Sequence, residues 1–94
     1  MSQPPPFTIQ RIARRAANYL RRLPKETQQT IIEAFEDICQ SPFSHSNPTV
    51  IRPLKGPHKG RWRYSVGDLR IIYSVNVQEK SVEIVAIGPR GDIY

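Results

Sequence analysis

The segment that most constrains the fold of this chain is RWRYSVGDLRIIYS, residues 61–74, which predicts a β-hairpin. Gly67-Asp68 is a two-residue turn with glycine first, as a type II′ hairpin prefers. Pairing across this turn sorts the side chains, because successive residues of a strand point to opposite faces. One face receives Trp62, Tyr64, Val66, Leu69, Ile71 and Tyr73, and the other receives Arg61, Arg63, Ser65, Arg70, Ile72 and Ser74. A slip of one residue in the pairing would place the arginines in the core, so the alternation of apolar and charged residues favours this register.

The remaining segments predict an α+β fold, with helices on one face of a mainly antiparallel sheet. Phe7–Ile12 is typical of a short strand or of the start of a helix. Ala13–Leu23 and residues 25–40 are predicted helices, separated by Pro24, which ends the first and suits the first turn of the second. Residues 50–60 are rich in Pro, Gly and basic residues, which indicates an irregular approach to the sheet. Strands are expected at about 61–66, 69–76 and 81–88, in a single domain of residues 7–94 that follows a disordered tail of residues 1–6.

Both predicted helices are amphipathic. The inward positions are Ile12, Ala16, Leu20 and Leu23 in the first helix, and Ile31, Ile32, Phe35, Ile38 and Cys39 in the second. The opposite side of the first helix is a basic stripe of Arg11, Arg14, Arg15, Arg21 and Arg22. We interpret this stripe as a solvated face, and binding to ribosomal RNA is its functional alternative.

The composition favours a polyanionic partner. The chain has 14 Lys+Arg against 8 Asp+Glu, a formal net charge of +6 and a pI near 10.0. Nucleic acid, an anionic membrane and an acidic protein all fit this balance. No apolar run reaches the length of a membrane span, and the N-terminal residues lack an apolar signal core. We therefore expect a cytoplasmic protein without membrane association.

Metal and cofactor chemistry are not expected. The single cysteine, Cys39, falls within a helical pattern and is interpreted as a buried thiol that packs as a small hydrophobe. His45 and His58 have no metal-ligand spacing with it.

The arginines of the hairpin predict a phosphate-binding face. Arg61, Arg63 and Arg70 lie close together without an acidic residue on that face, so they repel one another unless they meet an anion. A guanidinium group also donates two hydrogen bonds to a phosphate at once. The simpler alternative is a solvated polar face. Arg90 is expected at the edge of this face, and Tyr94 offers a ring for stacking and a phenol for proton transfer, or packs on the surface as a chain-end residue.

The sequence resembles the RelE/ParE superfamily of bacterial toxins, specifically its RelE-type messenger-RNA interferases. The resemblance covers most of the chain: two helices ending in LP and SP, then PLKG, RWRYSVGDLRIIYSV and the closing VAIGPRGDIY. It implies a compact α+β fold with a four-stranded sheet, in which FTIQRI is the first strand. It also implies a cognate antitoxin, which the positive charge of this chain predicts to be acidic, and cleavage of mRNA in the ribosomal A site.

Matching positions carry the site residues of this family onto the chain. Arg61 and Arg63 fall on the basic strand positions, Arg70 on the hairpin arginine, Arg90 on the arginine after the last strand and Tyr94 on the C-terminal tyrosine. The resemblance implies phosphate clamps at the first three, stabilisation of the phosphorane or leaving group by Arg90, and base stacking or proton transfer by Tyr94. The two strand positions are lysines in the best-known RelE branch. Arginine does not release its proton, so the general base stays open.

Two other functions fit the same features. The ParE branch of this fold inhibits DNA gyrase and needs no nuclease site, and the hairpin motif alone does not separate the two branches. A basic RNA-binding or ribosome-binding module without catalysis is the third interpretation. It predicts RNA affinity that survives the loss of Tyr94, with no cleavage products.

Overall fold

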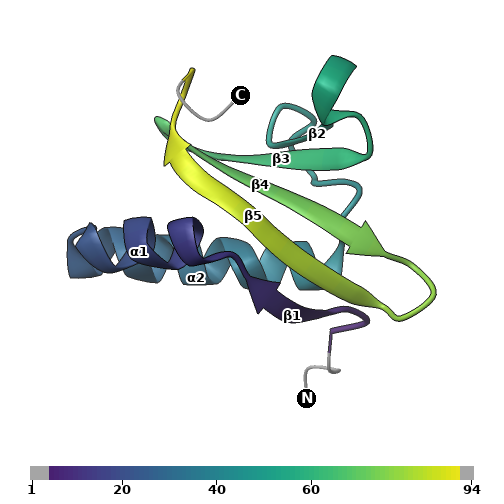
Figure 1. Cartoon of the computed structure of the whole chain (residues 1–94), viewed down its shortest axis with the longest axis horizontal. Helices are drawn as coiled ribbons and strands as arrows, with labels where there is room; N and C mark the ends of the chain where they lie inside the picture. Colours follow the sequence, from purple (N-terminus) through teal and green to yellow (C-terminus); the bar gives the residue numbers. More distant parts are fainter. Residues whose placement is uncertain (1–4, 92–94) are drawn as a thin grey trace.

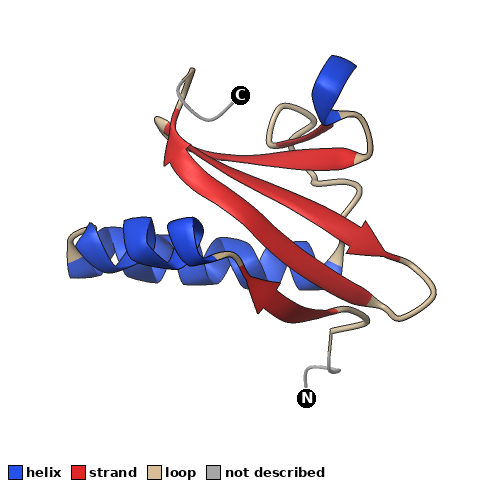
Figure 2. Cartoon of the chain, viewed as in Figure 1, coloured by secondary structure: helices blue, strands red, loops and turns tan. Residues whose placement is uncertain are grey.

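The computed structural model describes residues 5–91, which form a five-stranded sheet with two helices against one of its faces (Figure 1 and Figure 2). In chain order the elements are β1 (Thr8–Ile12), α1 (Arg14–Arg22), α2 (Lys25–Gln40), β2 (Ile51–Pro53), the short 3-10 helix η1 (Gly56–His58), β3 (Arg61–Val66), β4 (Leu69–Asn76) and β5 (Ser81–Pro89). The strand order is β1-β5-β4-β3-β2. Strand β1 runs parallel to β5, and the other neighbouring pairs are antiparallel.

The α+β prediction is confirmed, and the prediction of a four-stranded sheet is wrong because the sheet has five strands and is mixed. The missed strand is β2, which is three residues long and ends in Pro53. Proline removes a donor from the ladder and argues against a strand, but the edge of a sheet tolerates it. The segment Phe7–Ile12 is a strand over its last five residues, as the resemblance implied.

Helix α2 spans the predicted residues, whereas α1 is one residue shorter at each end than predicted. Ala13 and Leu23 both have extended backbone dihedrals, and Leu23 precedes Pro24, which disfavours a helical residue before it. Arg11 and Ile12 therefore belong to β1, which corrects their assignment to the first helix. No helix in residues 5–91 is long and apolar enough to cross a membrane.

The core lies between the helices and one face of the sheet. Ile31, Phe35 and Ile38 of α2 are buried, as predicted, and they pack in one cluster with residues of β3, β4 and β5. The predicted inward position of Ile32 is wrong, because this side chain is 42% exposed. Ala34 lies three residues after Ile31, on the same face of the helix, and it is buried where Ile32 was expected to be.

The predicted hairpin register is confirmed at all six residue pairs of β3 and β4. Gly67 has a φ of 55° and the following Asp68 has no positive φ, which is the pattern of a type II′ turn. The register buries Tyr64, Ile71 and Tyr73 against the helices. It leaves the arginines on the opposite side of the sheet, here called the open face.

A bulge in β5 determines what lies beside the arginines on the open face. Val85 is the extra residue and has no partner on β4. Beyond it, Ala86 pairs with Ile72 and Gly88 pairs with Arg70. The bulge thus places two small residues, Ala86 and Gly88, beside β4 on the face that carries the arginines.

Candidate phosphate-binding surface

Three predicted site residues share the open face of β3 and β4. Arg61 and Arg63 lie two residues apart on β3, and Arg70 lies on β4 opposite Ser65. Arg61 is exposed, Arg63 is half-buried and Arg70 is only 8% exposed. The hairpin therefore brings together the arginines that the alternating pattern had grouped.

A fourth arginine on this face was not predicted. Arg52 of β2 is the cross-strand partner of Arg63, so the two side chains start from the same face of the sheet. The apolar-charged alternation of Ile51 and Arg52 was visible in the sequence, but Pro53 obscured the strand. The set of four residues is here called the arginine surface: Arg52, Arg61, Arg63 and Arg70.

Arg90 borders the arginine surface at the turn between β3 and β4. It follows β5 directly, and its backbone N–H donates to the carbonyl of Asp68 at 2.8 Å. Its side chain is exposed. This position fits the expectation that Arg90 emerges at the edge of the basic face. Tyr94, the remaining predicted site residue, lies outside the described residues.

Arg70 is held close to its own turn. Its Nη1 donates to the carbonyl oxygens of Gly67 and Leu69, both at 2.9 Å. Its Nε is buried and has no hydrogen-bond partner in the described part of the chain. A guanidinium so deeply buried is costly unless charge or hydrogen bonds compensate it, and two neutral carbonyls compensate only part.

Two further buried polar atoms lie near Arg70 without a partner among residues 5–91. They are Nε of Arg63 and Oγ of Ser65, the cross-strand neighbour of Arg70. Arg63 has one bond, from Nη2 to the carbonyl of Thr49 at 3.3 Å. Buried polar atoms in native proteins are almost always hydrogen-bonded, so these three atoms are an unfavourable feature of the fold. The guanidinium groups that an anion can reach directly include those of the exposed Arg61 and the half-buried Arg63.

The arginine surface is strongly positive because acidic partners are missing from it. The ion pairs of residues 5–91 are Arg11–Glu83 and His45–Asp37, and neither involves an arginine of this surface. On the open face of β5 the carboxylate is Glu83, whose cross-strand partner is Ser74. In the same part of the chain no three His, Cys, Asp or Glu side chains gather as metal ligands. The surface suits a phosphate held by hydrogen bonds and charge.

The two core tyrosines of the sheet are separated from this surface. Tyr64 donates to a carboxylate oxygen of Asp37 at 2.7 Å, and Tyr73 donates to the carbonyl of Pro42 at 2.6 Å. Burial raises the pKa of both phenols, and the hydrogen bond to Asp37 raises the pKa of Tyr64 further. Burial likewise raises the pKa of the Cys39 thiol, so it stays protonated. None of these groups is available to act on a ligand of the open face.

Residues 11–94 match the family model of the ParE toxin of the type II toxin–antitoxin system parDE. The chain belongs to the ParE toxin family. This family lies within the RelE/ParE superfamily that the hairpin and closing motifs had indicated. The toxin matches no curated protein closely enough to count as a relative.

Solved structures of related toxins share the fold. The toxin–antitoxin complex RelBE2 of Mycobacterium tuberculosis is matched at a TM-score of 0.75 and 24% identity, over 97% of this chain and 98% of that one. The archaeal RelE–RelB complex of Pyrococcus horikoshii is matched at a TM-score of 0.75 and 27% identity, over 92% of this chain and 97% of that one. The YoeB/ParE toxin of Agrobacterium tumefaciens is matched at a TM-score of 0.74 and 16% identity, over 89% of this chain and 98% of that one.

Proposed function

We propose that this toxin is a ribosome-dependent endoribonuclease that cleaves mRNA in the ribosomal A site and so inhibits translation. The observation that supports this most is the cluster of four arginines, Arg52, Arg61, Arg63 and Arg70, on one face of the sheet, none of which has an ion pair among residues 5–91. A phosphate diester supplies the negative charge and the acceptor oxygens that these groups lack.

The proposed reaction is a transesterification within the RNA. The 2′-hydroxyl loses its proton and its oxygen attacks the adjacent phosphorus. A bond from phosphorus to the 2′-oxygen forms, and the bond to the 5′-oxygen breaks as that oxygen takes a proton from Tyr94 or from water. Arg61, Arg63 and Arg70 hold the non-bridging oxygens and stabilise the added charge of the phosphorane. Arg90 stabilises the phosphorane or the departing 5′-oxygen, and Tyr94 stacks on a base or transfers a proton.

A general base must take the proton of the 2′-hydroxyl, and the arginine surface does not provide one. A guanidinium stays protonated at every pH at which the toxin is folded. In the proposed mechanism the surface acts electrostatically, by lowering the energy of the alkoxide as it forms. The proton passes to Tyr94, to water or to a group on the ribosome.

We also propose that a cognate acidic antitoxin neutralises this toxin. The M. tuberculosis and P. horikoshii relatives are toxin–antitoxin complexes with RelB-type partners. A net charge of +6 favours an acidic partner and speeds its capture. A segment that is partly disordered alone and orders on the toxin fits this role, because such a segment covers a large surface.

Inhibition of DNA gyrase is the second candidate function. It is favoured by the family model, which is that of the ParE toxins. The two candidates make opposite predictions for the arginine surface, because only the nuclease needs it for chemistry.

The experiment that tests the proposal compares mRNA cleavage on programmed ribosomes with gyrase supercoiling. We expect cleavage by the parent toxin, no effect on supercoiling, and a loss of about 10²–10³ in cleavage rate for Arg90→Ala. Lys25→Ala, at an exposed position of α2 outside the basic stripe and the arginine surface, is the control and cleaves like the parent. Tyr94→Phe separates stacking from proton transfer, since it keeps the ring and removes the phenol. Inhibited supercoiling without RNA cleavage would replace the proposal with the gyrase function.

A further inference from the structure

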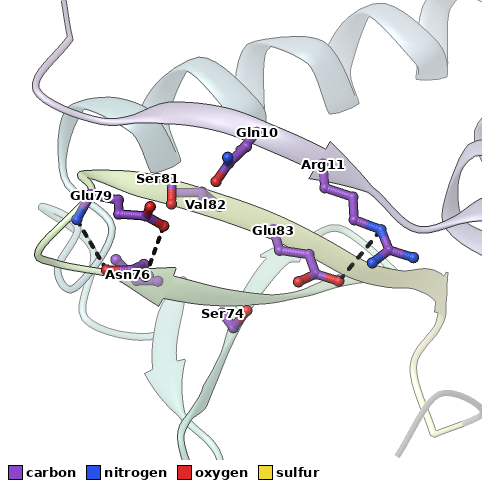
Figure 3. A pocket seen from close by; sticks show the side chains of 9 residues that line it. Gln10, Arg11, Ser74, Asn76, Glu79, Ser81, Val82 and Glu83 are labelled. Carbon is purple, nitrogen blue, oxygen red and sulfur yellow. Dashed lines mark hydrogen bonds and ion pairs between the residues drawn. The ribbon is translucent and has the colours of Figure 1, made fainter.

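A polar groove lies on the open face beside the arginine surface, at the end of the sheet where β4 and β5 are joined. Its volume is about 480 Å³. Figure 3 shows Gln10 and Arg11 reaching from β1 over β5, towards Ser81 and Glu83. The polar residues that line it are Gln10, Arg11, Ser74, Asn76, Glu79, Ser81 and Glu83.

One cross-strand row connects the groove to the arginine surface. Ser74 of β4 is the partner of Arg61 on β3 and also of Glu83 on β5. Glu83 in turn is the partner of Arg11 on β1. Neighbouring strands lie about 4.8 Å apart, so the groove begins one strand away from Arg61. A single RNA strand with a phosphate at Arg61 therefore passes next to the groove.

The chemistry of the groove suits a base and not a second phosphate. Gln10 provides an amide, Ser74 and Ser81 provide hydroxyl groups, and Glu83 provides a carboxylate that repels phosphate. The Arg11 side chain is 71% exposed and pairs with Glu83 at 4.0 Å, and the flat face of its guanidinium can stack on a base while this ion pair is kept. Recognition of an unstacked base requires a flat group that stacks on its ring and polar groups that hydrogen-bond to its edge, and the groove has both.

One wall of the groove is fixed by internal bonds. Asn76 Nδ2 donates to Glu79 Oε1 at 3.1 Å, and the backbone N–H of Glu79 donates to Asn76 Oδ1 at 3.0 Å. These two bonds hold the Asn76 side chain against Glu79 and use one of the two carboxylate oxygens of Glu79. In residues 5–91 Glu83 has no hydrogen bond of this kind, and its side chain is 42% exposed. The Glu83 carboxylate can therefore accept a hydrogen bond from a ligand in the groove.

We infer that the polar groove is a subsite for a nucleobase with an exocyclic amino group, on the nucleotide next to the one whose phosphate the arginine surface holds. This inference rests on the proposed function and names a selectivity for it. A carboxylate only accepts hydrogen bonds, so Glu83 binds the amino group of cytosine, adenine or guanine. Uracil presents carbonyl oxygens on either side of its N3–H, and those oxygens repel the carboxylate. The groove therefore discriminates against uracil.

The first test follows the backbone amide signals of isotope-labelled toxin by NMR during titration with hexauridylate or with hexacytidylate. We expect both RNAs to shift signals of β3, and only hexacytidylate to shift the signals of Gln10, Ser81 and Glu83. Groove signals that move equally with both RNAs, or with neither, would overturn the inference. Groove shifts with hexacytidylate in a toxin that cuts no RNA on ribosomes would keep the subsite and contradict the nuclease function.

The second test measures how Glu83→Gln changes the ratio of the affinities for the two RNAs. We expect the preference for hexacytidylate to fall about tenfold, because a carboxylate–amino contact of this kind discriminates by roughly that factor. Glu36→Gln, at an exposed position of α2, removes the same charge and is expected to leave the ratio unchanged. Equal ratios in the parent and in Glu83→Gln would show that Glu83 does not read the base.

Discussion

Arg52 and Arg63 are direct cross-strand partners on the open face, at the edge of the sheet. Like charges at such a position destabilise a sheet, and neither arginine has a carboxylate partner among residues 5–91. Arg63 contacts a single carbonyl, that of Thr49. The fold thus retains two guanidinium groups where neutral residues would be more stable, as expected if this pair binds an anion in the proposed function.

The first prediction concerns Arg52→Gln. Removing one of two opposed like charges is expected to raise the free energy of unfolding by roughly 0.2–1 kcal/mol, as measured by urea denaturation at low salt. The same change is expected to weaken RNA binding and to lower the salt slope of log K by about 0.7, the value for one phosphate contact on a single strand. Arg22→Gln is the control and keeps the parent's slope. A variant that is less stable and binds RNA normally would contradict the role of this pair.

A second prediction uses sulfate as a probe of the buried donors. If Arg63, Ser65 and Arg70 form an anion site, sulfate stabilises the folded toxin by binding to it, by about 1.4 kcal/mol at ten times its dissociation constant. Sulfate also stabilises proteins in general, so the measured quantity is the gain over chloride at equal ionic strength in the parent and in Arg63→Gln. The gain is expected to shrink in Arg63→Gln and to persist in Arg21→Gln on α1. Equal gains in all three proteins would exclude a specific site.

The register of the arginines was predictable because the information is local. A glycine-first turn and the alternation in the six residue pairs around it admit only one pairing that buries Tyr64 and Tyr73. The partner of Arg63 on β2 was not predictable in this way. Three residues with a proline carry too little pattern, and the pairing depends on how the loop after α2 returns to the sheet.

The environment of the site was less predictable than its residues. Alternation assigns Arg70 to the open face, but it does not reveal that the side chain bonds to the carbonyls of its own turn. The bulge at Val85 has no signal in the sequence, yet it determines that Ala86 and Gly88 face the arginines. The three buried polar atoms without a hydrogen-bond partner in residues 5–91 lie on β3 and β4, and their burial depends on packing between strands, which no single segment encodes.

A third prediction concerns stability at high pH. Burial raises the pKa of Tyr73, and the neighbouring Tyr64 adds to this, while an unfolded tyrosine titrates near pH 10. The folded phenol keeps its proton when the unfolded one has lost it, so its contribution is complete below about pH 10 and is lost as the pH rises further. We expect the free energy of unfolding to fall between pH 10 and 11, with a slope that Tyr73→Phe reduces by at most about 1.4 kcal/mol per pH unit. Parallel slopes in the two proteins would show that Tyr73 is not kept neutral by the fold.

The last prediction tests the use of arginine on β3 in place of a group that can lose its proton. Arg63 lies beside Arg52 and near Arg70, so a lysine at this position would be crowded by positive charge. Like charges disfavour the protonated amine and lower its pKa towards neutrality. Arg63→Lys is therefore expected to lower phosphate affinity, because an ammonium lacks the two-pronged contact. It is also expected to change the pH profile of the cleavage rate by adding an ascending limb near the pKa of the lysine. The measurement is the single-turnover rate on programmed ribosomes from pH 6 to 9, with Arg22→Lys as the control. If the profile of Arg63→Lys has the same shape as that of the parent, residue 63 does not face the 2′-hydroxyl, and its part in the reaction is limited to holding the phosphate.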